Sequence, residues 1–505
     1  MARPFLGIDV GTSATRVSVI DAQGTLLAGA SCGFSTDVRG PGQAEQDPRQ
    51  WLEALRGALV EIAASSPPAA VGICGQTPTL VPVHAVGVRP ALTWQDTRAG
   101  LEAAELGARF GDPRPLIGTT LAWSPANLPA KLLWLARHEP EALSSTRWLL
   151  QPKDFIGLEL TGRVVSDPWS SKGICTVSDG SPAEAVLAAC GWLATVCPPT
   201  AAAWERAGTV TEEAARRYGL PEGIPVSVGW SDALAQVLAA CCFVRESGFF
   251  FTGTSAIAGT PVAGYEVSAP GLFSVPTSCA PLALCYGPTQ SSGASVSWVA
   301  RVLGCRPADV AAIAAKAKGE PPSFVPYLSG ERAPLWDPDV RALFLGLSAD
   351  HGPAEIALAV VEGVLGSARH VLSLAESATG VPIEEVEVVG RGVGDPSFES
   401  LALRSFGATL RFHPDVELSA RGTAMLAAAA AGAELGEATR SMGDRPRIAR
   451  RTEADRASSA TLLERYLRAS EMATSWRRQI LGEPHLTTNL QPTLTTKGGN
   501  ACSRS

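Results

Sequence analysis

The chain has 505 residues, of which 46% are hydrophobic and 18% are charged, and its formal net charge is −7. Single hydrophobic cores stop growing near roughly 250–300 residues, so this length predicts two domains, and the composition is that of a folded globular protein rather than a disordered one. The acidic balance argues against a nucleic-acid or anionic-membrane partner, because either would require a basic face.

Cysteine usage and the first residues indicate a cytoplasmic protein. The eleven cysteines form no C-x-x-C pair and no Cys/His cluster at zinc spacing, a pattern typical of reduced thiols. The chain does not open with a basic region followed by an apolar run, as a secretory signal would. The uncharged stretches 247–265 and 267–300 are rich in Gly, Pro, Ser and Thr, so we expect strands and turns there and no membrane span.

Strands and helices alternate in the first half of the chain. Short apolar runs predict strands at Phe5–Ile8, Val17–Ile20 and Val71–Ile73. Ala- and Leu-rich amphipathic stretches predict helices at Pro48–Ala64 and Pro129–Arg137. This alternation is typical of α/β layers.

The second half repeats the alternation. Strands are predicted at Val226–Gly229, Gly248–Thr252 and Val386–Gly390, and helices at Ala233–Cys242, Ser291–Leu303, Ala354–Ala378 and Asp455–Leu481. We therefore expect an N-terminal domain over residues 1–245 and a C-terminal domain over residues 246–482. Residues 483–505 lack periodicity and have few apolar anchors, so we expect a disordered tail.

The sequence G-T-S-A occurs twice, at Gly11–Ala14 and at Gly253–Ala256. The first copy lies between two apolar runs, which predicts a hairpin whose turn points N–H groups and hydroxyls at an anion. Asp9 beside this turn suits a hydrated Mg²⁺, which takes one or two carboxylates plus phosphate oxygens. An ordinary hairpin turn of small residues explains one copy equally well, but two facing turns can hold one polyphosphate. Neither copy is a P-loop or a G-x-G-x-x-G fingerprint.

Several segments, in order along residues 4 to about 430, resemble the FGGY carbohydrate kinases and, among them, the xylulokinases. The most specific is P-Y-L-S-G-E-R-A-P-L-W-D-P-D-V-R-A-L-F-L-G-L-S, which begins the stretch Pro326–Gly363. D-x-G-T-S from Asp9, G-x-x-D-A from Gly229 and the second G-T-S fit the same family. W-Q-D-T-R, K-L-L-W-L-A-R-H-E-P and L-Q-P-K-D-F are also similar to xylulokinase segments.

The resemblance implies a two-domain α/β protein of the actin/hexokinase-like (ribonuclease H-like) fold, with a cleft between the domains for ATP and a sugar. It implies an ATP-dependent kinase that phosphorylates a terminal hydroxyl of a ketopentose or related polyol, with Asp232 as the general base and Asp9 holding Mg²⁺. From its position alone, a plain helix cap is the favoured reading of Asp232, and the two roles can coexist. The residues implied to bind the nucleotide and its phosphates are Gly11, Thr12, Ser13, Arg16, Gly253, Thr254, Ser255, Gly390, Arg391 and Gly392.

Two of these nucleotide residues depart from the family pattern. Arg16 stands where the family usually carries Lys, and either cation could touch a phosphate. Arg391 interrupts the family's Gly-Gly-Gly, where glycine allows close approach of the backbone to the nucleotide. The sequence leaves open whether Arg391 covers the adenine or obstructs it.

The residues implied to bind the sugar are Gln76, Thr77, Trp94, Asp96, Arg98 and Asp232. A surface ion pair beneath Trp94 is the alternative reading of Asp96 and Arg98. Two positions depart from the xylulokinases, which carry Gln-Met-His where this chain has Gln-Thr-Pro and Asn where it has Ala233. Ribulose, a tetrulose, glycerol and gluconate therefore stay open as substrates beside xylulose.

Two other classes of protein also use parts of this pattern. An actin-fold ATPase or phosphatase, such as a heat-shock chaperone or an exopolyphosphatase, uses similar D-x-G-T-S turns, but Glu331-Arg332 and the stretch 342–362 argue against it. A catalytically silent relative that binds a sugar or nucleotide would explain the altered sugar residues, yet this chain retains Asp9 and Asp232. A small-molecule sugar or polyol is the expected partner, and a homodimer is compatible with the sequence.

Overall fold

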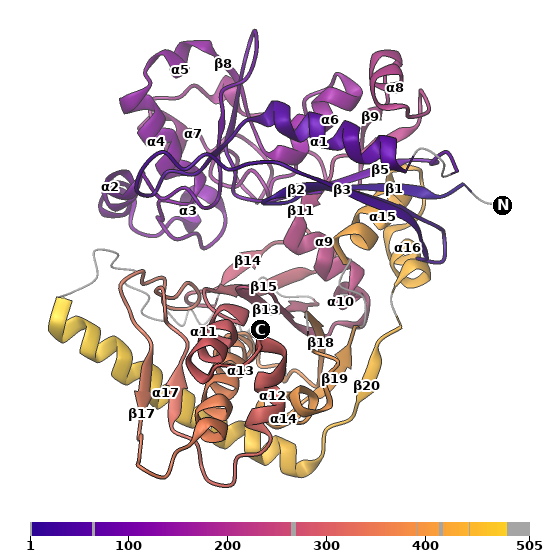
Figure 1. Ribbon diagram of the computed structural model, residues 1–505. Helices are drawn as coiled ribbons and strands as arrows, with labels where there is room; N and C mark the ends of the chain where they lie inside the picture. Colours follow the sequence, from indigo (N-terminus) through magenta and orange to yellow (C-terminus); the bar gives the residue numbers. More distant parts are fainter. Residues whose placement is uncertain are drawn as a thin grey trace, which may run out of the picture.

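The computed structural model describes residues 3–62, 66–263, 269–390, 392–413, 418–443 and 445–481. It has two lobes, and each is built on a seven-stranded mixed sheet with helices against its faces (Figure 1). The predicted two-domain α/β architecture is confirmed. The predicted tail over residues 483–505 lies outside the described residues, as does Arg391.

The sheet of the N-terminal lobe has the order β3-β2-β1-β5-β10-β9, and β11 also pairs with β5. Its strands are β1 (Phe5–Val10), β2 (Ala14–Ile20), β3 (Leu26–Gly33), β5 (Val71–Gly75), β9 (Arg206–Thr209), β10 (Pro225–Ser227) and β11 (Trp230–Ser231). β1, β2 and β3 are antiparallel, whereas β5 lies parallel to both β1 and β10.

The sheet of the C-terminal lobe has the order β14-β15-β13-β12-β18-β19-β20. Its strands are β12 (Gly248–Thr252), β13 (Ala256–Val262), β14 (Phe273–Val275), β15 (Ala283–Thr289), β18 (Glu385–Gly390), β19 (Thr409–Phe412) and β20 (Arg447–Ala449). β12, β13 and β15 are antiparallel and β18 and β19 run parallel to β12, as β5 and β10 do to β1. Both lobes therefore start from the same hairpin, which explains why the G-T-S turn occurs twice.

Helices cover these sheets, and the short strands of the described residues pair into separate two-stranded sheets. The helices of the N-terminal part are α1 (Pro48–Glu61), α2 (Gly100–Phe110), α3 (Arg114–Ile117), α4 (Leu128–His138), α5 (Glu141–Ser145), α6 (Pro152–Thr161), α7 (Glu184–Ala189), α8 (Glu212–Tyr218), α9 (Asp232–Ala239) and α10 (Cys242–Arg245). Those that follow are α11 (Gly293–Leu303), α12 (Val310–Ala314), α13 (Pro353–Thr379), α14 (Pro396–Phe406), α15 (Leu418–Ala430), α16 (Leu435–Met442) and α17 (Glu453–Leu481). The short strands are β4 (Glu45–Gln46), β6 (Val81–His84), β7 (Ala91–Leu92), β8 (Thr146–Leu150), β16 (Ser323–Val325) and β17 (Leu343–Leu345).

The single helix predicted over Ala233–Cys242 is two helices in the structure. α9 ends at Ala239, and Cys241 then takes a left-handed conformation with φ 61° before α10 begins. An α-helix cannot continue through such a residue. The hydrophobic pattern of the sequence does not reveal this break, because apolar side chains are buried in both helices.

The two halves of the sequence do not coincide with the two lobes. α15 comes from the C-terminal half but packs on β1, β5 and α9 of the N-terminal lobe, and Figure 1 shows α15 at this sheet with α16 next to it. The contact is close, because a Cβ at Gly72 would overlap the carbonyl of Thr423. The division at residues 245 and 246 thus separates the two sheets, but the C-terminal segment also completes the first lobe.

α13 is the one helix in the described residues that is long and apolar enough to cross a membrane. It is largely buried and packs against β13, β15 and β16 and against α11, α12, α14 and α17. We therefore regard α13 as a core helix of the C-terminal lobe.

Candidate active site

A cleft of about 1590 Å³ lies between the lobes and is lined by residues of both. Ligand pockets of proteins typically measure about 300–1,000 Å³, so this cleft has room for two substrates at once. Of the residues predicted from the sequence, it is lined by Asp9, Thr12, Arg16, Gln76, Thr77, Trp94, Asp232, Gly253, Thr254, Ser255, Gly390 and Gly392. Residues from nearly the whole chain therefore meet at one site.

The first hairpin places a carboxylate and a cation at the cleft. Asp9 and Arg16 are opposite each other in the β1–β2 register, and Arg16 Nη1 lies 3.6 Å from Asp9 Oδ2. The turn is closed by a hydrogen bond from Gly11 N to Ala14 O of 3.0 Å. Gly11 and Ser13 themselves do not line the cleft: Gly11 is buried, and the carbonyl of Ser13 accepts a hydrogen bond from Phe34 N.

The second hairpin has the same turn but no carboxylate. Gly253 N donates to Ser255 O at 2.8 Å, and all three turn residues line the cleft. When the two G-T-S turns are matched, the position of Asp9 is taken by Phe251, whose ring packs 5.0 Å from that of Phe249. Only the first hairpin therefore offers a carboxylate to a metal ion.

Asp232 lies at the start of α9, at the cleft. The cap of this helix is Ser231, whose hydroxyl accepts from Leu234 N at 3.4 Å, while Asp232 Oδ1 accepts from the adjacent Ala233 N at 2.8 Å. Burial and the negative charge of Asp9 raise the pKa of Asp232 to about 7. Asp232 is thus not the helix cap, and its pKa is near the value that suits a general base at neutral pH.

Gln76 and Trp94, which were predicted to bind the sugar, are hydrogen-bonded to the first hairpin. Trp94 Nε1 donates to Thr12 Oγ1 at 3.1 Å, and Gln76 N donates to Val10 O at 2.9 Å. Gln76 Nε2 donates to Gln46 Oε1 at 2.8 Å, whereas Gln76 Oε1 is buried and has no hydrogen-bond partner within the part of the chain that the structure describes. A buried, unpaired acceptor at a cleft is suited to a hydroxyl of a ligand.

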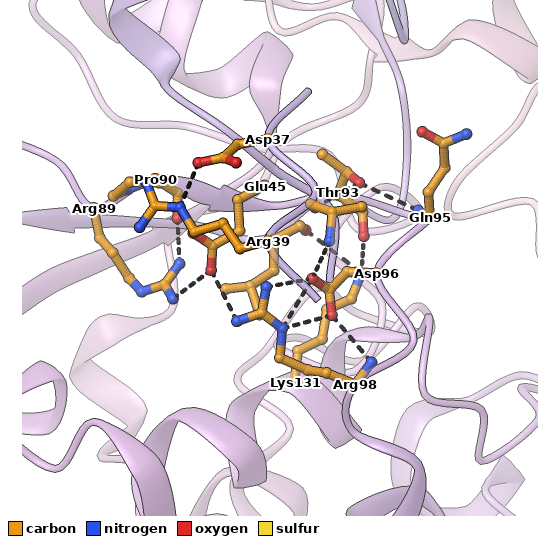
Figure 2. A network of polar contacts seen from close by, with 12 residues as sticks. Asp37, Arg39, Glu45, Arg89, Pro90, Thr93, Gln95, Asp96, Arg98 and Lys131 are labelled. Carbon is orange, nitrogen blue, oxygen red and sulfur yellow. Dashed lines mark hydrogen bonds and ion pairs between the residues drawn. The ribbon is translucent and has the colours of Figure 1, made fainter. Parts of the chain in front are cut away.

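The structure does not bring Asp96 and Arg98 into the cleft. Both are buried in an ion-pair network (Figure 2), in which Arg98 Nη2 lies 2.7 Å from Asp96 Oδ2 and Arg98 Nη1 lies 3.0 Å from Glu45 Oε1. Lys131 Nζ supports the same loop by donating to Thr93 O at 2.7 Å. The network holds the loop from behind, and its cleft side is formed by Trp94, Gln95 and Thr97.

Several cleft residues were not predicted from the sequence. The Lys172 ammonium lies 4.5 Å from the centre of the Trp169 ring and donates to Trp169 O, and burial lowers its pKa to about 8. Ser170–Gly173, which includes Lys172, belongs to no helix or strand, so no hydrophobic period in the sequence predicts its position. The rest of this wall comes from distant strands and loops and contains Phe273, Tyr286, Glu331, Arg332 and Trp336.

The expected adenosine end of the cleft follows β18. Gly390 pairs with Thr252 in the β12–β18 register, next to the second hairpin, and a Cβ at Gly390 would overlap the carbonyl of Thr252. Asp395, the N-cap of α14, and Phe398 of α14 also line the cleft. Gly390 therefore lets two strand ends meet closely at the site.

Comparison with known proteins agrees with this arrangement. Residues 5–240 match the N-terminal domain of the FGGY family of carbohydrate kinases, and residues 250–431 match its C-terminal domain. The xylulose kinase of Escherichia coli (strain K12) is 30% identical over 450 residues, which cover 85% of this chain and 90% of that protein.

Two solved structures show that the fold alone does not select a substrate. Ligand-bound xylulose kinase from Lactobacillus acidophilus has a TM-score of 0.86 at 22% identity, and the match covers 95% of this chain and 100% of that one. Gluconate kinase from the same organism has the same TM-score and identity, with 94% and 99% covered. The two matches are equally good although the two named substrates differ.

Proposed function

The chain belongs to the FGGY family of carbohydrate kinases and is a sugar kinase, and on this premise we propose a reaction for it. It transfers the γ-phosphoryl group of ATP to a terminal hydroxyl of a ketopentose or related polyol, as a xylulokinase does. The observation that carries the proposal is Asp232, a carboxyl with a pKa of about 7 at a cleft that is also lined by Thr12 of the first G-T-S turn and by all three residues of the second.

Asp232 is the general base of the proposed reaction. The hydroxyl oxygen of the sugar attacks the γ-phosphorus, its proton passes to the Asp232 carboxylate, and the bond between the γ-phosphorus and the β–γ bridging oxygen breaks to release ADP. α9 fixes Asp232 at its first residue, so the base is positioned by a rigid element.

The two hairpins hold the phosphates of ATP from opposite lobes. Thr12 of the first turn and Gly253–Ser255 of the second line the cleft with hydroxyl and backbone N–H groups, and Arg16 adds a cation. Gly390 and Gly392 allow the adenosine to approach the backbone, and Arg391 stays a predicted contact. The side chain of Asp9 fits Mg²⁺, which would offset phosphate charge when bound, because hard oxygen ligands suit this ion.

The sugar lies between Trp94 and the wall of the cleft that contains Phe273, Tyr286 and Trp336. Trp94 supplies an apolar face and Gln76 Oε1 an unpaired acceptor, with Thr77 beside them. Asp96 and Arg98 act by holding the loop of Trp94. Ribulose, a tetrulose, glycerol and gluconate are included with xylulose in the substrate class. We place the enzyme in the cytoplasm, and a homodimer is part of the proposal to be tested.

The proposal is tested by ADP release over a panel of ketoses, polyols and aldonates, followed by Asp232→Asn with the best substrate. General-base catalysis typically contributes about 10²–10⁴-fold, and we expect a loss of this size in kcat with retained ATP binding. Asp455→Asn, in the first turn of α17, is the matched control and should retain full activity. An Asp232→Asn enzyme within about threefold of wild type would remove Asp232 from its role. Wild-type protein that binds ligands but turns over none of the panel would instead be a silent relative.

A further inference from the structure

We propose that Arg332 is a further catalytic residue, whose guanidinium contacts the phosphoryl group while it is being transferred. The inference rests on the kinase reaction proposed above. It concerns a residue that the sequence places in the segment after Pro326 but that was assigned no part in the site.

Arg332 is anchored next to the second phosphate turn. Its Nη2 donates to Thr289 O at 2.8 Å, and Thr289 pairs with Ala256, the residue that follows Ser255, in the β13–β15 register. Arg332 is therefore bonded to the residue that pairs with the one directly after the Gly253–Ser255 turn. Arg332 lines the same cleft as this turn and Asp232.

The guanidinium of Arg332 has at least one hydrogen-bond donor that is not used within the described residues. Arginine carries five N–H donors, and Nε of Arg332 is buried without a hydrogen-bond partner among the described residues. Over the same residues no carboxylate oxygen forms an ion pair with Arg332 within 4 Å. Burial lowers the pKa of Arg332 and the charge of Glu331 only partly opposes this, so an anionic ligand group would stabilise the guanidinium further.

The backbone around Arg332 is held in place. Glu331 Oε1 accepts from Gln290 N at 2.5 Å and from Arg332 N at 2.8 Å, which ties the loop to the end of β15. Trp336 N donates to Arg332 O, and Trp336 Nε1 donates to Gly271 O at 2.8 Å. A donor fixed before the reaction stabilises developing charge without reorganisation during the step.

Tyr286, Arg332 and Asp232 line the same cleft. Burial raises the pKa of Tyr286, a hydrogen bond with Trp169 lowers it, and the charges of Asp232 and Arg332 act on it in opposite directions. One hydroxyl on β15 thus lies within electrostatic range of the proposed base and of the proposed phosphoryl contact. Negative charge on the equatorial oxygens of the phosphoryl group would be offset by Arg332 while Asp232 takes the proton.

Steady-state kinetics of Arg332→Ala and Arg332→Lys test the inference. Loss of one such donor typically costs about 10²–10³-fold in kcat, and we expect Arg332→Ala to lose this much with KM for Mg-ATP within about threefold of wild type. Added guanidinium ion should restore part of the activity of Arg332→Ala, and Arg332→Lys should lie between the two. Arg341→Ala is the matched control, because Arg341 also donates to backbone carbonyls in this segment but lies outside the cleft lining.

A binding measurement separates catalysis from support of the fold. ADP with aluminium fluoride and the sugar mimics the phosphoryl group in transfer, and Arg332→Ala should weaken this complex at least about tenfold more than it weakens ADP alone. Equal weakening of both, a lowered Tm and no rescue by guanidinium would mean a structural role and would overturn the inference. Activity of Arg332→Ala within about threefold of wild type overturns it as well. Wild-type enzyme that phosphorylates nothing in the panel overturns the proposed function instead.

Discussion

At the scale of single residues, the repulsion between Asp9 and Asp232 predicts the pH dependence of the reaction. A general base must be deprotonated, and the pKa of Asp232 is raised to about 7 by burial and by Asp9. We expect kcat/KM to rise tenfold per pH unit below pH about 7 and to level off above it. Asp9→Asn should move this midpoint to lower pH as well as lower the rate, because it removes the neighbouring charge. A rate profile that is flat between pH 5 and pH 8 would contradict the assignment.

The residues that could be predicted from sequence are those next to a turn or a strand end. Asp9, Thr12 and Asp232 follow or precede apolar runs, and the strand edge then fixes where they lie. Asp96 and Arg98 could not be placed in this way, because their side chains turn behind the loop into an ion-pair network that includes Glu45. Asp96 and Arg98 do form an ion pair, but it is buried rather than at the surface, and Arg98 lies over the ring of Trp134. Residues distant in the sequence determine this arrangement.

At the scale of elements, the two hairpins are expected to share the binding of Mg-ATP. Thr12→Val and Thr254→Val each remove one hydroxyl from a turn, and a single hydrogen bond contributes about 0.5–1.5 kcal/mol, or roughly two- to tenfold in Kd. Calorimetric titration with ATP, with and without Mg²⁺, measures this, and Thr461→Val on the exposed face of α17 is the control. Unchanged affinity in either turn variant would show that one hairpin alone holds the phosphates.

The elements that sequence reasoning located best are those stabilised locally. The apolar runs of β1, β5 and β12 are buried almost throughout, and their strand assignment follows from composition. Many short elements between Ala91 and Thr200 depend on partners distant in the sequence, so their positions do not follow from local sequence. Thr119 Oγ1, for example, donates to Ser274 O of the other lobe at 2.6 Å. Lys172 lies in this region, so its place in the cleft could not be read from nearby residues.

At the scale of the whole molecule, the cleft between the lobes predicts closure on binding. Each lobe holds part of the nucleotide, so transfer requires the lobes to approach, and closure also expels water that would otherwise accept the phosphoryl group. The lobes are already joined by hydrogen bonds such as Ser278 Oγ to Val177 O at 2.6 Å, so we expect rotation about this side rather than separation. Small-angle scattering should show a smaller radius of gyration with sugar and a further decrease with a non-hydrolysable ATP analogue. An unchanged radius with both ligands bound would exclude closure.

The packing of α15 on the first lobe also constrains the order in which the protein can be made. The ribosome synthesises β1 and β5 long before residues 418–430, so the sheet face that α15 covers stays bare during translation of the whole second lobe. Gly7 and Gly72 have no side chain, so Thr423 lies directly against that face of the sheet. The apolar surface of the nascent N-terminal lobe therefore stays exposed until α15 has been synthesised. Chaperone binding during synthesis would fall within this interval.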